Sequence, residues 1–344
     1  MSSTEPRIAV VGGGAIGGIT AACLARGGHQ VDLVCKHKKI AQRAHEPGLH
    51  VFGVKGDFLA PVNGVETVSQ LEGPYDLVFL ATKATDMMPA AHELLPLLKQ
   101  DSLVVSQQNG ICEEALAKVL GTERVIGCVV GFGATMHGPA ELEKTSEGEF
   151  VIGCLGQEQD PRLGTLKNLM DLVAPTRISQ NIMGELYAKL IINSCINSLG
   201  AMSGLYLGEM LAKKRARKIF IAIMREAMAV AQAMELKVEK GADGRLDYYG
   251  FLADGALAGF KRHLLIRIIG FKYRRLKSSS LQSLERNKPT EIDYLNGYIV
   301  DKGHELGVAT PVNAQVIMII KAIEAGQRKL HPANLADPAF ETSL

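Results

Sequence analysis

Near its N-terminus the chain reads Ile8-Ala9-Val10-Val11-Gly12-Gly13-Gly14-Ala15-Ile16-Gly17. The four apolar residues predict a buried strand, and residues 15–26 predict a helix directly after the glycines. Gly12 permits a tight turn, Gly14 lets the backbone approach a pyrophosphate, and Gly17 lets the helix pack closely on the strand. The free N–H groups of that helix would face the phosphates. A glycine-rich turn without a ligand is the alternative, and three clustered glycines would be a costly way to build one. The pattern therefore predicts dinucleotide binding by Gly12, Gly14, Ala15, Ile16 and Gly17.

The rest of the first half repeats this alternation of strand and helix. Runs of mainly apolar residues occur at residues 31–35, where Asp32 is the one charged member, and at residues 77–81, 103–105 and 125–129. Such runs, separated by helices, predict a parallel sheet covered on both faces. Pro139, Gly148 and the apolar residues that follow, up to about residue 156, indicate an antiparallel hairpin among the later strands.

The second half has a different pattern. Apolar residues recur at helical spacing in residues 185–199, 212–234, 289–306 and 311–325. Pro289 and Pro311 stand where proline opens a helix. We therefore expect an α/β domain of Rossmann type over residues 1–178, followed by an all-helical domain over residues 179–344.

Composition excludes several classes of protein. The 344 residues are 47% hydrophobic and 22% charged, with a net charge of +2. This balance disfavours a general nucleic-acid binder, and no apolar run reaches the roughly 18 residues of a membrane span. The six cysteines are scattered, without CxxC pairs or metal-ligand spacing. We expect a cytoplasmic protein with reduced cysteines, no metal, and neither nucleic acid nor membrane as a partner.

The end of the second strand distinguishes between the two nicotinamide cofactors. An enzyme that uses NAD usually has Asp or Glu there, to accept a hydrogen bond from the ribose 2′-hydroxyl. Here the chain reads Cys35-Lys36-His37-Lys38-Lys39. Lys36 and its neighbours could pair with the 2′-phosphate of NADP(H), and a solvated basic turn is the alternative. The turn favours NADP(H).

A stripe of polar residues runs along the helix expected at residues 185–199. Lys189, Asn193 and Asn197 recur at every fourth position and therefore share one face. The residues between them are apolar, so the stripe must have partners inside the protein. One interpretation is a satisfied polar network between helices. The other is a substrate cleft in which the lysine is a general acid.

Six motifs follow one another along the chain: Gly12–Gly17, Thr82-Lys83, Gln108-Asn109-Gly110, the Lys189/Asn193/Asn197 helix, Ser278-Ser279-Ser280-Leu281-Gln282 and Thr290-Glu291-Ile292-Asp293-Tyr294-Leu295-Asn296-Gly297. In these motifs and their order, the chain resembles the ketopantoate reductase (2-dehydropantoate 2-reductase) family over nearly its whole length. The resemblance implies a Rossmann domain joined to a helical domain, in the arrangement of 6-phosphogluconate dehydrogenase-like proteins. It also implies NADPH-dependent reduction of ketopantoate to pantoate, a step towards pantothenate and coenzyme A.

The resemblance implies a role for each matching residue. Lys189 corresponds to the general acid that protonates the C2 oxygen, and Glu291 to a glutamate that positions substrate and supports turnover. Asn193, Asn197 and Ser279 correspond to groups that hold the substrate hydroxyl and carboxylate. The three other matches are Asn109 where nicotinamide and substrate meet, Lys83 near the cofactor phosphates, and Lys36 at the 2′-phosphate. Tyr187 stands where many relatives carry tryptophan.

The segment before Ser279 departs from compact relatives. Residues 240–277 form a longer stretch, whose second half carries Lys261, Arg262, Arg267, Lys272, Arg274, Arg275 and Lys277 without an acidic residue. This departure keeps a second substrate open, a bulkier or more anionic 2-oxo acid. A third hypothesis, an NADP(H)-binding sensor without activity, gives no reason to retain Lys189 and Glu291. For the segment itself we expect a cap over the active site, with a solvated face or a contact in a homodimer as alternatives and a membrane surface ranked last.

Overall fold

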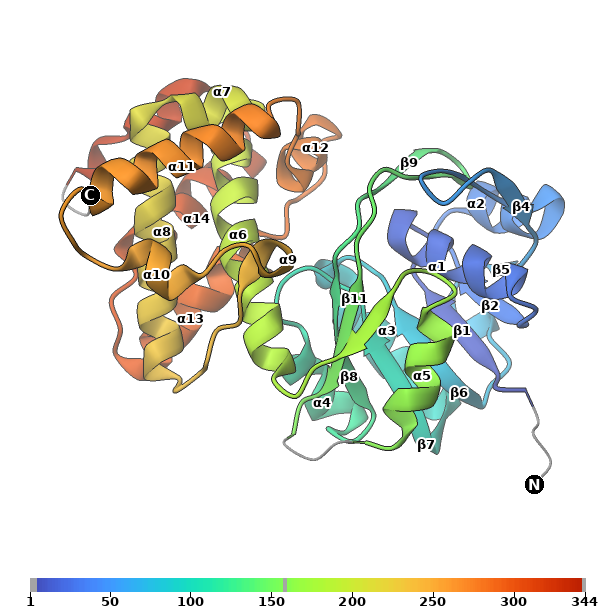
Figure 1. Ribbon diagram of the computed structural model, residues 1–344. Helices are drawn as coiled ribbons and strands as arrows, with labels where there is room; N and C mark the ends of the chain where they lie inside the picture. Colours follow the sequence, from blue (N-terminus) through green and yellow to red (C-terminus); the bar gives the residue numbers. More distant parts are fainter. Residues whose placement is uncertain (1–4, 157–159, 342–344) are drawn as a thin grey trace. The chain divides into compact units, whose positions relative to one another are not determined.

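The computed structural model describes residues 5–156 and 160–341, and the chain forms two compact units, Met1–Leu186 and Tyr187–Leu344 (Figure 1). Unit 1 is built on an eight-stranded sheet in the order β12-β11-β8-β7-β6-β1-β2-β5. All neighbouring strands pair in parallel except β8 and β11. The strands are β1 (Ile8–Val11), β2 (Val31–Val34), β5 (Asn63–Val65), β6 (Tyr75–Leu80), β7 (Leu98–Ser106), β8 (Val125–Val130), β11 (Phe150–Cys154) and β12 (Thr176–Ile178).

Helices cover this sheet because its central strands are apolar on both faces. The side chains of β1 are at most 2% exposed, so each face of the sheet needs a cover. The main helices of unit 1 are α1 (Ala15–Arg26), α2 (Lys38–Arg43), α3 (Ala84–Leu94), α4 (Glu113–Leu120) and α5 (Arg162–Met170). Because α1 contacts β1 and β2 and also the smaller sheet, it forms a layer between the two sheets.

The smaller sheet has four strands in the order β4-β3-β10-β9. They are β3 (Leu49–Gly53), β4 (Phe58–Ala60), β9 (Ala134–Gly138) and β10 (Glu141–Lys144). The antiparallel β9–β10 pair confirms the predicted hairpin. The sheet as a whole was not predicted, because its strands are only three to five residues long and partly exposed.

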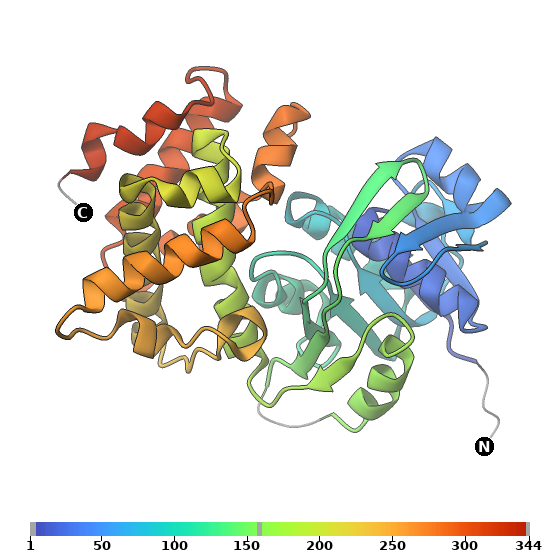
Figure 2. The same ribbon diagram turned by 45° about the horizontal axis from the view of Figure 1, so that its top comes forward.

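Unit 2 is helical, and with unit 1 it confirms the predicted fold class (Figure 2). Among the described residues, its α-helices of five or more residues are α6 (Ile182–Ser203), α7 (Leu207–Ala212), α8 (Lys214–Ala233), α10 (Tyr248–Leu252), α11 (Ala258–Lys272), α12 (Ser279–Glu285), α13 (Asn296–Leu306) and α14 (Pro311–Glu324). Helices α8, α13 and α14 pack on one another, and α11 packs on α7 and α8. Helix α6 begins in unit 1 and continues into unit 2.

The two prolines expected to open helices have different outcomes. Pro311 is the first residue of α14, as predicted. Pro289 does not begin a helix, because the N–H and hydroxyl of Thr290 both donate to Glu324 at 2.7 Å and hold the chain outside helical geometry. A short 3-10 helix, η4 (Ile292–Tyr294), then precedes α13. Within the described ranges, the longest apolar helices are still too short or too polar to cross a bilayer.

Candidate active site

The glycine-rich turn between β1 and α1 depends on the absence of side chains at three positions. Gly12 has φ of +118°, and a Cβ there would lie 2.5 Å from the carbonyl carbon of Ala81. A Cβ at Gly17 would lie 2.1 Å from the carbonyl oxygen of Gly12, and one at Gly13 would lie 2.4 Å from Sγ of Cys35. Any larger residue at these positions would separate the turn from the strands beneath it.

Gly14 differs from the other glycines of the turn. No atom lies within 4 Å of the place its Cβ would take, and the residue is exposed at the start of α1. The first-turn N–H groups of α1 have no side-chain cap. An open backbone at a helix N-terminus fits a pyrophosphate, whose charge the helix dipole and the free N–H groups stabilise.

The predicted cofactor residues of unit 1 lie along one edge of the large sheet. The turn follows β1, Lys36 follows β2, Lys83 follows β6, and Asn109 follows β7. These four strands are parallel neighbours, so their carboxyl ends share that edge. The chain also changes direction there, since β2 and β6 lie on opposite sides of β1. Parallel α/β sheets bind their ligands at such a point.

Two glutamines next to these residues, Gln107 and Gln108, were not among the site residues predicted from the sequence. Gln108 accepts a hydrogen bond from the Ser106 hydroxyl at 2.7 Å and donates to the Thr82 hydroxyl at 3.3 Å. Gln107 is 5% exposed and accepts from Thr20 at 3.4 Å. Among the described residues, Nε2 of Gln107 has no hydrogen-bond partner. A buried donor without a partner at this edge is a further fit to a polar ligand.

Lys36 has a partner that is distant in sequence. Its Nζ lies 3.4 Å from both carboxylate oxygens of Asp86, which is in the first turn of α3. The two side chains are 77% and 48% exposed, so the ion pair is weak and a stronger anion could replace it. No signal near Lys36 in the sequence indicates Asp86.

The polar stripe of unit 2 lies on α6. Lys189 and Asn193 are half-buried and Asn197 is buried. Gly200 continues the same face one turn further on, and a Cβ there would lie 2.3 Å from Oγ of Ser278. The start of α12, with the exposed Ser279, therefore packs beside the far end of this stripe.

Two buried tyrosines hold the turn of α6 that carries Lys189. The Tyr187 hydroxyl donates to the carbonyl oxygen of Ala227 on α8 at 2.8 Å. The Tyr248 hydroxyl, on α10, donates to the carbonyl oxygen of Ala188. Burial raises the pKa of both phenols, so they remain protonated donors at neutral pH. This turn is thus fixed from two sides by hydrogen bonds in a dry environment.

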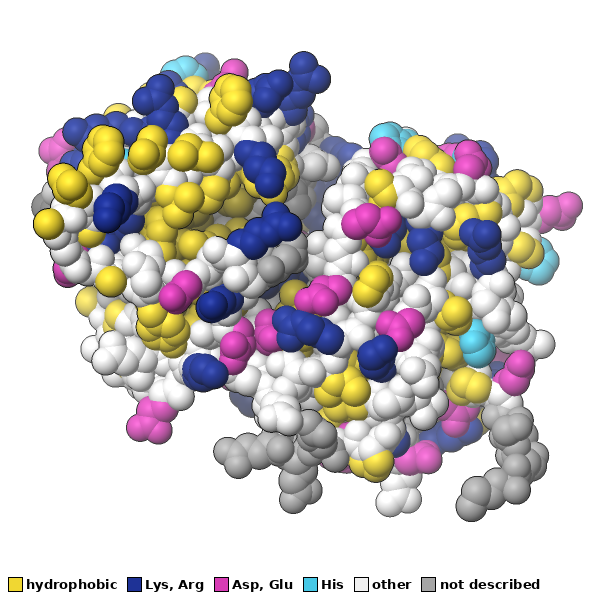
Figure 3. Space-filling model, in the orientation of Figure 1, with side chains coloured by type: hydrophobic (Ala, Val, Ile, Leu, Met, Phe, Trp, Pro, Cys, Tyr) yellow, Lys and Arg dark blue, Asp and Glu magenta, His cyan; other side chains and the backbone are white. Residues whose placement is uncertain are grey.

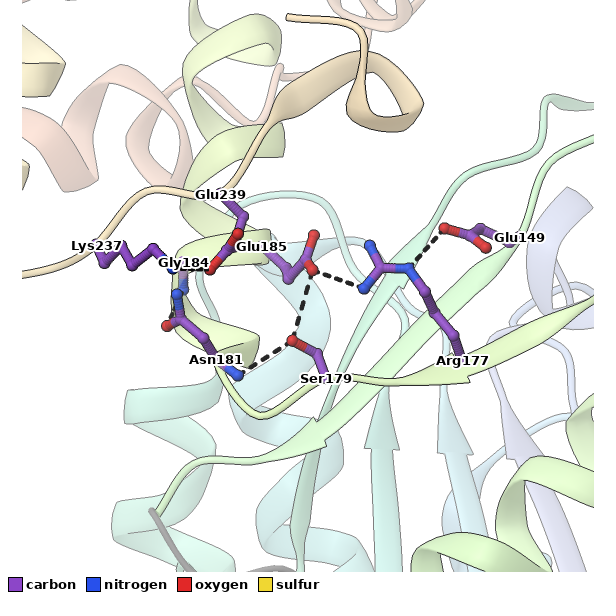
Figure 4. Close-up of polar contacts among 8 residues, drawn as sticks. All are labelled: Glu149, Arg177, Ser179, Asn181, Gly184, Glu185, Lys237 and Glu239. Atoms are coloured by element: carbon purple, nitrogen blue, oxygen red, sulfur yellow. Dashed lines mark hydrogen bonds and ion pairs between the residues drawn. The ribbon is translucent and has the colours of Figure 1, made fainter. Parts of the chain in front are cut away.

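The start of α6 is held by a second set of contacts (Figure 4). Arg177 of β12 donates to Glu149 at 2.8 Å and to Glu185 of α6 at 2.7 Å. These two carboxylates raise the pKa of Arg177, with Glu185 the larger cause. Oδ1 of Asn181 accepts from the N–H of Gly184 at 3.2 Å and caps the helix.

Glu291 lies at the N-cap of η4 and is half-buried. The helix that follows is tied to α6, because Nδ2 of Asn296 donates to the carbonyl oxygen of Ser194 at 3.3 Å and to Oδ1 of Asn313 at 2.8 Å. Asn313 donates in turn to Glu226 at 2.7 Å. Asn296 lies within the motif Thr290–Gly297, but the sequence offers no sign of its partners.

The predicted site residues therefore form two sets. Unit 1 contains Gly12, Gly14, Ala15, Ile16, Gly17, Lys36, Lys83 and Asn109, and unit 2 contains Lys189, Asn193, Asn197, Ser279 and Glu291. The first set suits a dinucleotide. The second set offers an ammonium, two amides, a hydroxyl and a carboxylate, which suit a small polar substrate.

Comparison with known proteins covers both units. The family model described as ketopantoate reductase PanE/ApbA matches residues 8–157, and its C-terminal counterpart matches residues 181–324. The chain belongs to the ketopantoate reductase family. Family members it resembles include the 2-dehydropantoate 2-reductases of Archaeoglobus fulgidus, 28% identical over 93% of this chain and 98% of that protein, and of Vibrio cholerae, 29% identical over 94% and 99%.

Solved structures agree with this family assignment. A PanE/ApbA family ketopantoate reductase from Ralstonia eutropha JMP134 is 30% identical, with a TM-score of 0.79 over 93% of this chain and 99% of that chain. A D-mandelate dehydrogenase in a ternary complex with NADH and anilino(oxo)acetate has a TM-score of 0.78 at 24% identity, over 93% and 98%. The second likeness establishes the shared fold only. Within the ketopantoate reductase family, this chain is an oxidoreductase.

Proposed function

We propose that the chain reduces the C2 ketone of 2-dehydropantoate to the alcohol of pantoate with NADPH, and that it serves pantothenate and coenzyme A synthesis in the cytoplasm. The observation that carries the proposal is the stripe of Lys189, Asn193 and Asn197 on α6, held in place by Tyr187 and Tyr248 in a chain of this family. The six free cysteines are consistent with a reducing compartment.

Each polar group of unit 2 then has a chemical task. The bound NADPH supplies the hydride. As negative charge develops on the C2 oxygen, the ammonium of Lys189 stabilises it and delivers the proton. The amides of Asn193 and Asn197 and the hydroxyl of Ser279 hold the substrate hydroxyl and carboxylate, and Glu291 orients the substrate. Asn109 of unit 1 is assigned to the junction of nicotinamide and substrate.

The preference for NADPH over NADH is part of the same proposal. The basic turn Lys36–Lys39 is exposed, and it follows directly after β2 and Cys35, where NAD enzymes usually place a carboxylate. Lys83 after β6 would add a second cation for the phosphates. NADH is the second candidate, because a protein of the same fold forms a complex with it.

The test is oxidation of NADPH and of NADH by the purified protein, followed at 340 nm with a panel of 2-oxo acids. We expect the highest kcat/KM with 2-dehydropantoate and NADPH. The panel includes 2-oxo acids with aromatic and with dicarboxylate side groups, because a D-mandelate dehydrogenase shares the fold and because the segment before Ser279 is strongly basic. A clear preference for one of those acids would change the proposed substrate and leave the proposed mechanism unchanged. Binding of NADPH without turnover of any acid would favour a sensor instead.

A further inference from the structure

Helix α11 has apolar side chains on two opposite faces. One face packs on α7 and α8, where Ile266 is buried and a Cβ at Gly270 would lie 2.8 Å from Cβ of Leu211. The opposite face carries a row of large side chains, at steps of three or four residues, that point into solvent (Figure 3): Leu257, Phe260, Leu264, Ile268 and Phe271. Folding of this unit therefore leaves a full apolar stripe uncovered.

We propose that this outward face of α11 is the two-fold interface of a homodimer, in which the α11 helices of two copies pack antiparallel with Leu264 at the axis. The proposal is independent of the substrate and of the catalytic roles given above. For this segment it takes the homodimer contact, which the sequence left as an alternative, in place of the expected cap over the active site.

The size of the apolar face supports a protein partner. Between residues 257 and 276, eight large apolar side chains expose between 42 and 72% of their surface. Five are the stripe itself (Leu257, Phe260, Leu264, Ile268 and Phe271), and three lie beside it along the chain (Leu265, Tyr273 and Leu276). Side chains of this size have surfaces on the order of 200 Å², so together they expose roughly 800 Å². The largest apolar patch of a typical monomer is about 300–600 Å². A standard interface buries about 800 Å² from each partner, which is the area available here.

The charges favour an antiparallel pair. Between Asp254 and Glu285 the sequence has no acidic residue, and Lys272, Arg274 and Arg275 gather at the C-terminal end of α11. Asp254, before the N-terminal end, is 91% exposed and lies 3.7 Å from both Arg225 and Arg262 of its own copy, so it is the acidic member of a charge cluster at that end. A parallel pair would bring the two sets of cations together. An antiparallel pair instead brings the cations of one copy towards Asp254 of the other, and it also opposes the two helix dipoles.

The shape of the surface fits the same arrangement. Where the stripe reaches Phe271, it borders a hollow of about 680 Å³ that is also lined by Tyr206, Arg274 and Glu209. In an antiparallel pair centred on Leu264, the position opposite Phe271 is Leu257, which is 71% exposed and stands at the other end of the stripe. Leu257 of each copy would fill the hollow of the other.

The first test measures molar mass by light scattering during gel filtration, over a hundredfold range of protein concentration. We expect a dimer, and we expect Leu264→Arg, which would face a second arginine across the axis, to halve the mass while circular dichroism stays unchanged. Met318→Arg is the matched control, because Met318 is 60% exposed on α14 and lies outside the stripe. A monomeric wild type, or a Leu264→Arg protein that remains dimeric, would overturn the proposal.

The second test reports the geometry through cross-linking under mild oxidation. Leu264→Cys should form a disulfide with its own copy, because a residue on the axis faces itself. Phe260→Cys should cross-link to Ile268→Cys in a mixture of the two variants and poorly to itself. Phe260→Cys that pairs with itself would contradict the antiparallel arrangement. A further outcome is a monomeric wild type that binds vesicles of phosphatidylglycerol, together with a Leu264→Arg variant that does not bind them. In that case the face binds a membrane and the dimer is rejected.

Discussion

At the scale of single residues, the proposed chemistry depends most on Lys189. Because its ammonium is assigned both charge stabilisation and proton delivery, we expect Lys189→Ala to lower kcat by about 10²-fold or more. The protein should stay folded and should bind NADPH as before, since the proposed cofactor residues lie in unit 1. Steady-state kinetics and a fluorescence titration of NADPH measure the two properties. Near-normal turnover would remove Lys189 from the mechanism.

Lys36 carries the choice of cofactor at the same scale. Lys36→Asp should weaken NADPH binding by about ten- to a hundredfold, because a charge-assisted contact to phosphate contributes roughly 1.5–3 kcal/mol, and should leave NADH nearly unaffected. The new carboxylate would also lie beside Asp86 and repel the phosphate further. Lys39→Asp on α2 makes the same change in net charge and should have a smaller effect. Equal losses in both variants, or a wild type that prefers NADH, would contradict this role of Lys36.

The sequence predicts a residue's environment well where the requirement is local. Gly12 and Gly17 must be small because of atoms in the adjoining strands, and the strand-turn-helix order reveals this need. The sequence did not predict the contact of Asp86 with Lys36 or that of Tyr248 with Ala188. Each contacts its partner only after some fifty or sixty residues have folded between them, and neither lies in a recognisable motif.

At the scale of elements, the contact between α6 and α12 can be tested through Gly200. A Cβ there would lie 2.3 Å from Oγ of Ser278, so Gly200→Ala should displace the start of α12 and Ser279 with it. We expect a higher KM for the 2-oxo acid and a lower melting temperature, although alanine is the better helix former by about 1 kcal/mol. Gly164→Ala on α5 is the matched control, since nothing lies within 4 Å of its Cβ position and the change should stabilise the protein. A Gly200→Ala enzyme with unchanged KM would show that Ser279 does not need this packing.

The smaller sheet contains a histidine that should make stability depend on pH. Nδ1 of His50 lies 2.6 Å from Glu141 and its Nε2 lies 2.9 Å from Asp57. The hydrogen bond to Glu141, and then that to Asp57, raises the pKa of His50 above its usual 6.5. The stabilisation is therefore fully present below pH 6.5 and is lost as the pH rises through the higher pKa of the folded state. Urea unfolding between pH 6 and 9 should show this loss, and His50→Gln should remove it. An unchanged slope in the variant would assign the dependence to another group.

The elements themselves were predicted to different degrees. The large sheet and the long helices have apolar patterns of several residues, which the sequence shows directly. The smaller sheet was missed because β3 pairs with β10, nearly ninety residues later, through short strands with mixed polarity. The prediction that a helix begins at Pro289 was wrong for a related reason. Thr290 donates hydrogen bonds to Glu324, which lies 34 residues later in the sequence.

At the scale of the whole molecule, the two units share helix α6. The boundary between Leu186 and Tyr187 falls inside this helix, whose start is held by Arg177 and whose next turn is held by Tyr187. Because neither unit can lose its part of α6 without fraying the other, we expect one cooperative unfolding transition in calorimetry. NADPH should raise the midpoint temperature of that single transition, since a ligand at a hundred times its Kd adds about 2.7 kcal/mol to the free energy of unfolding. Two transitions, with only one moved by NADPH, would contradict the coupling.

The same helix has a consequence for how the protein can be cut. Proteases cleave chains that can extend into their active sites, and they usually find such chains in the loops between domains. Here the junction has no loop, because residues on both sides of it are in helical hydrogen bonds. Limited digestion should therefore leave residues 182–203 intact while exposed turns are nicked. Each half, if expressed alone, would begin or end inside a broken helix with unsatisfied N–H or C=O groups.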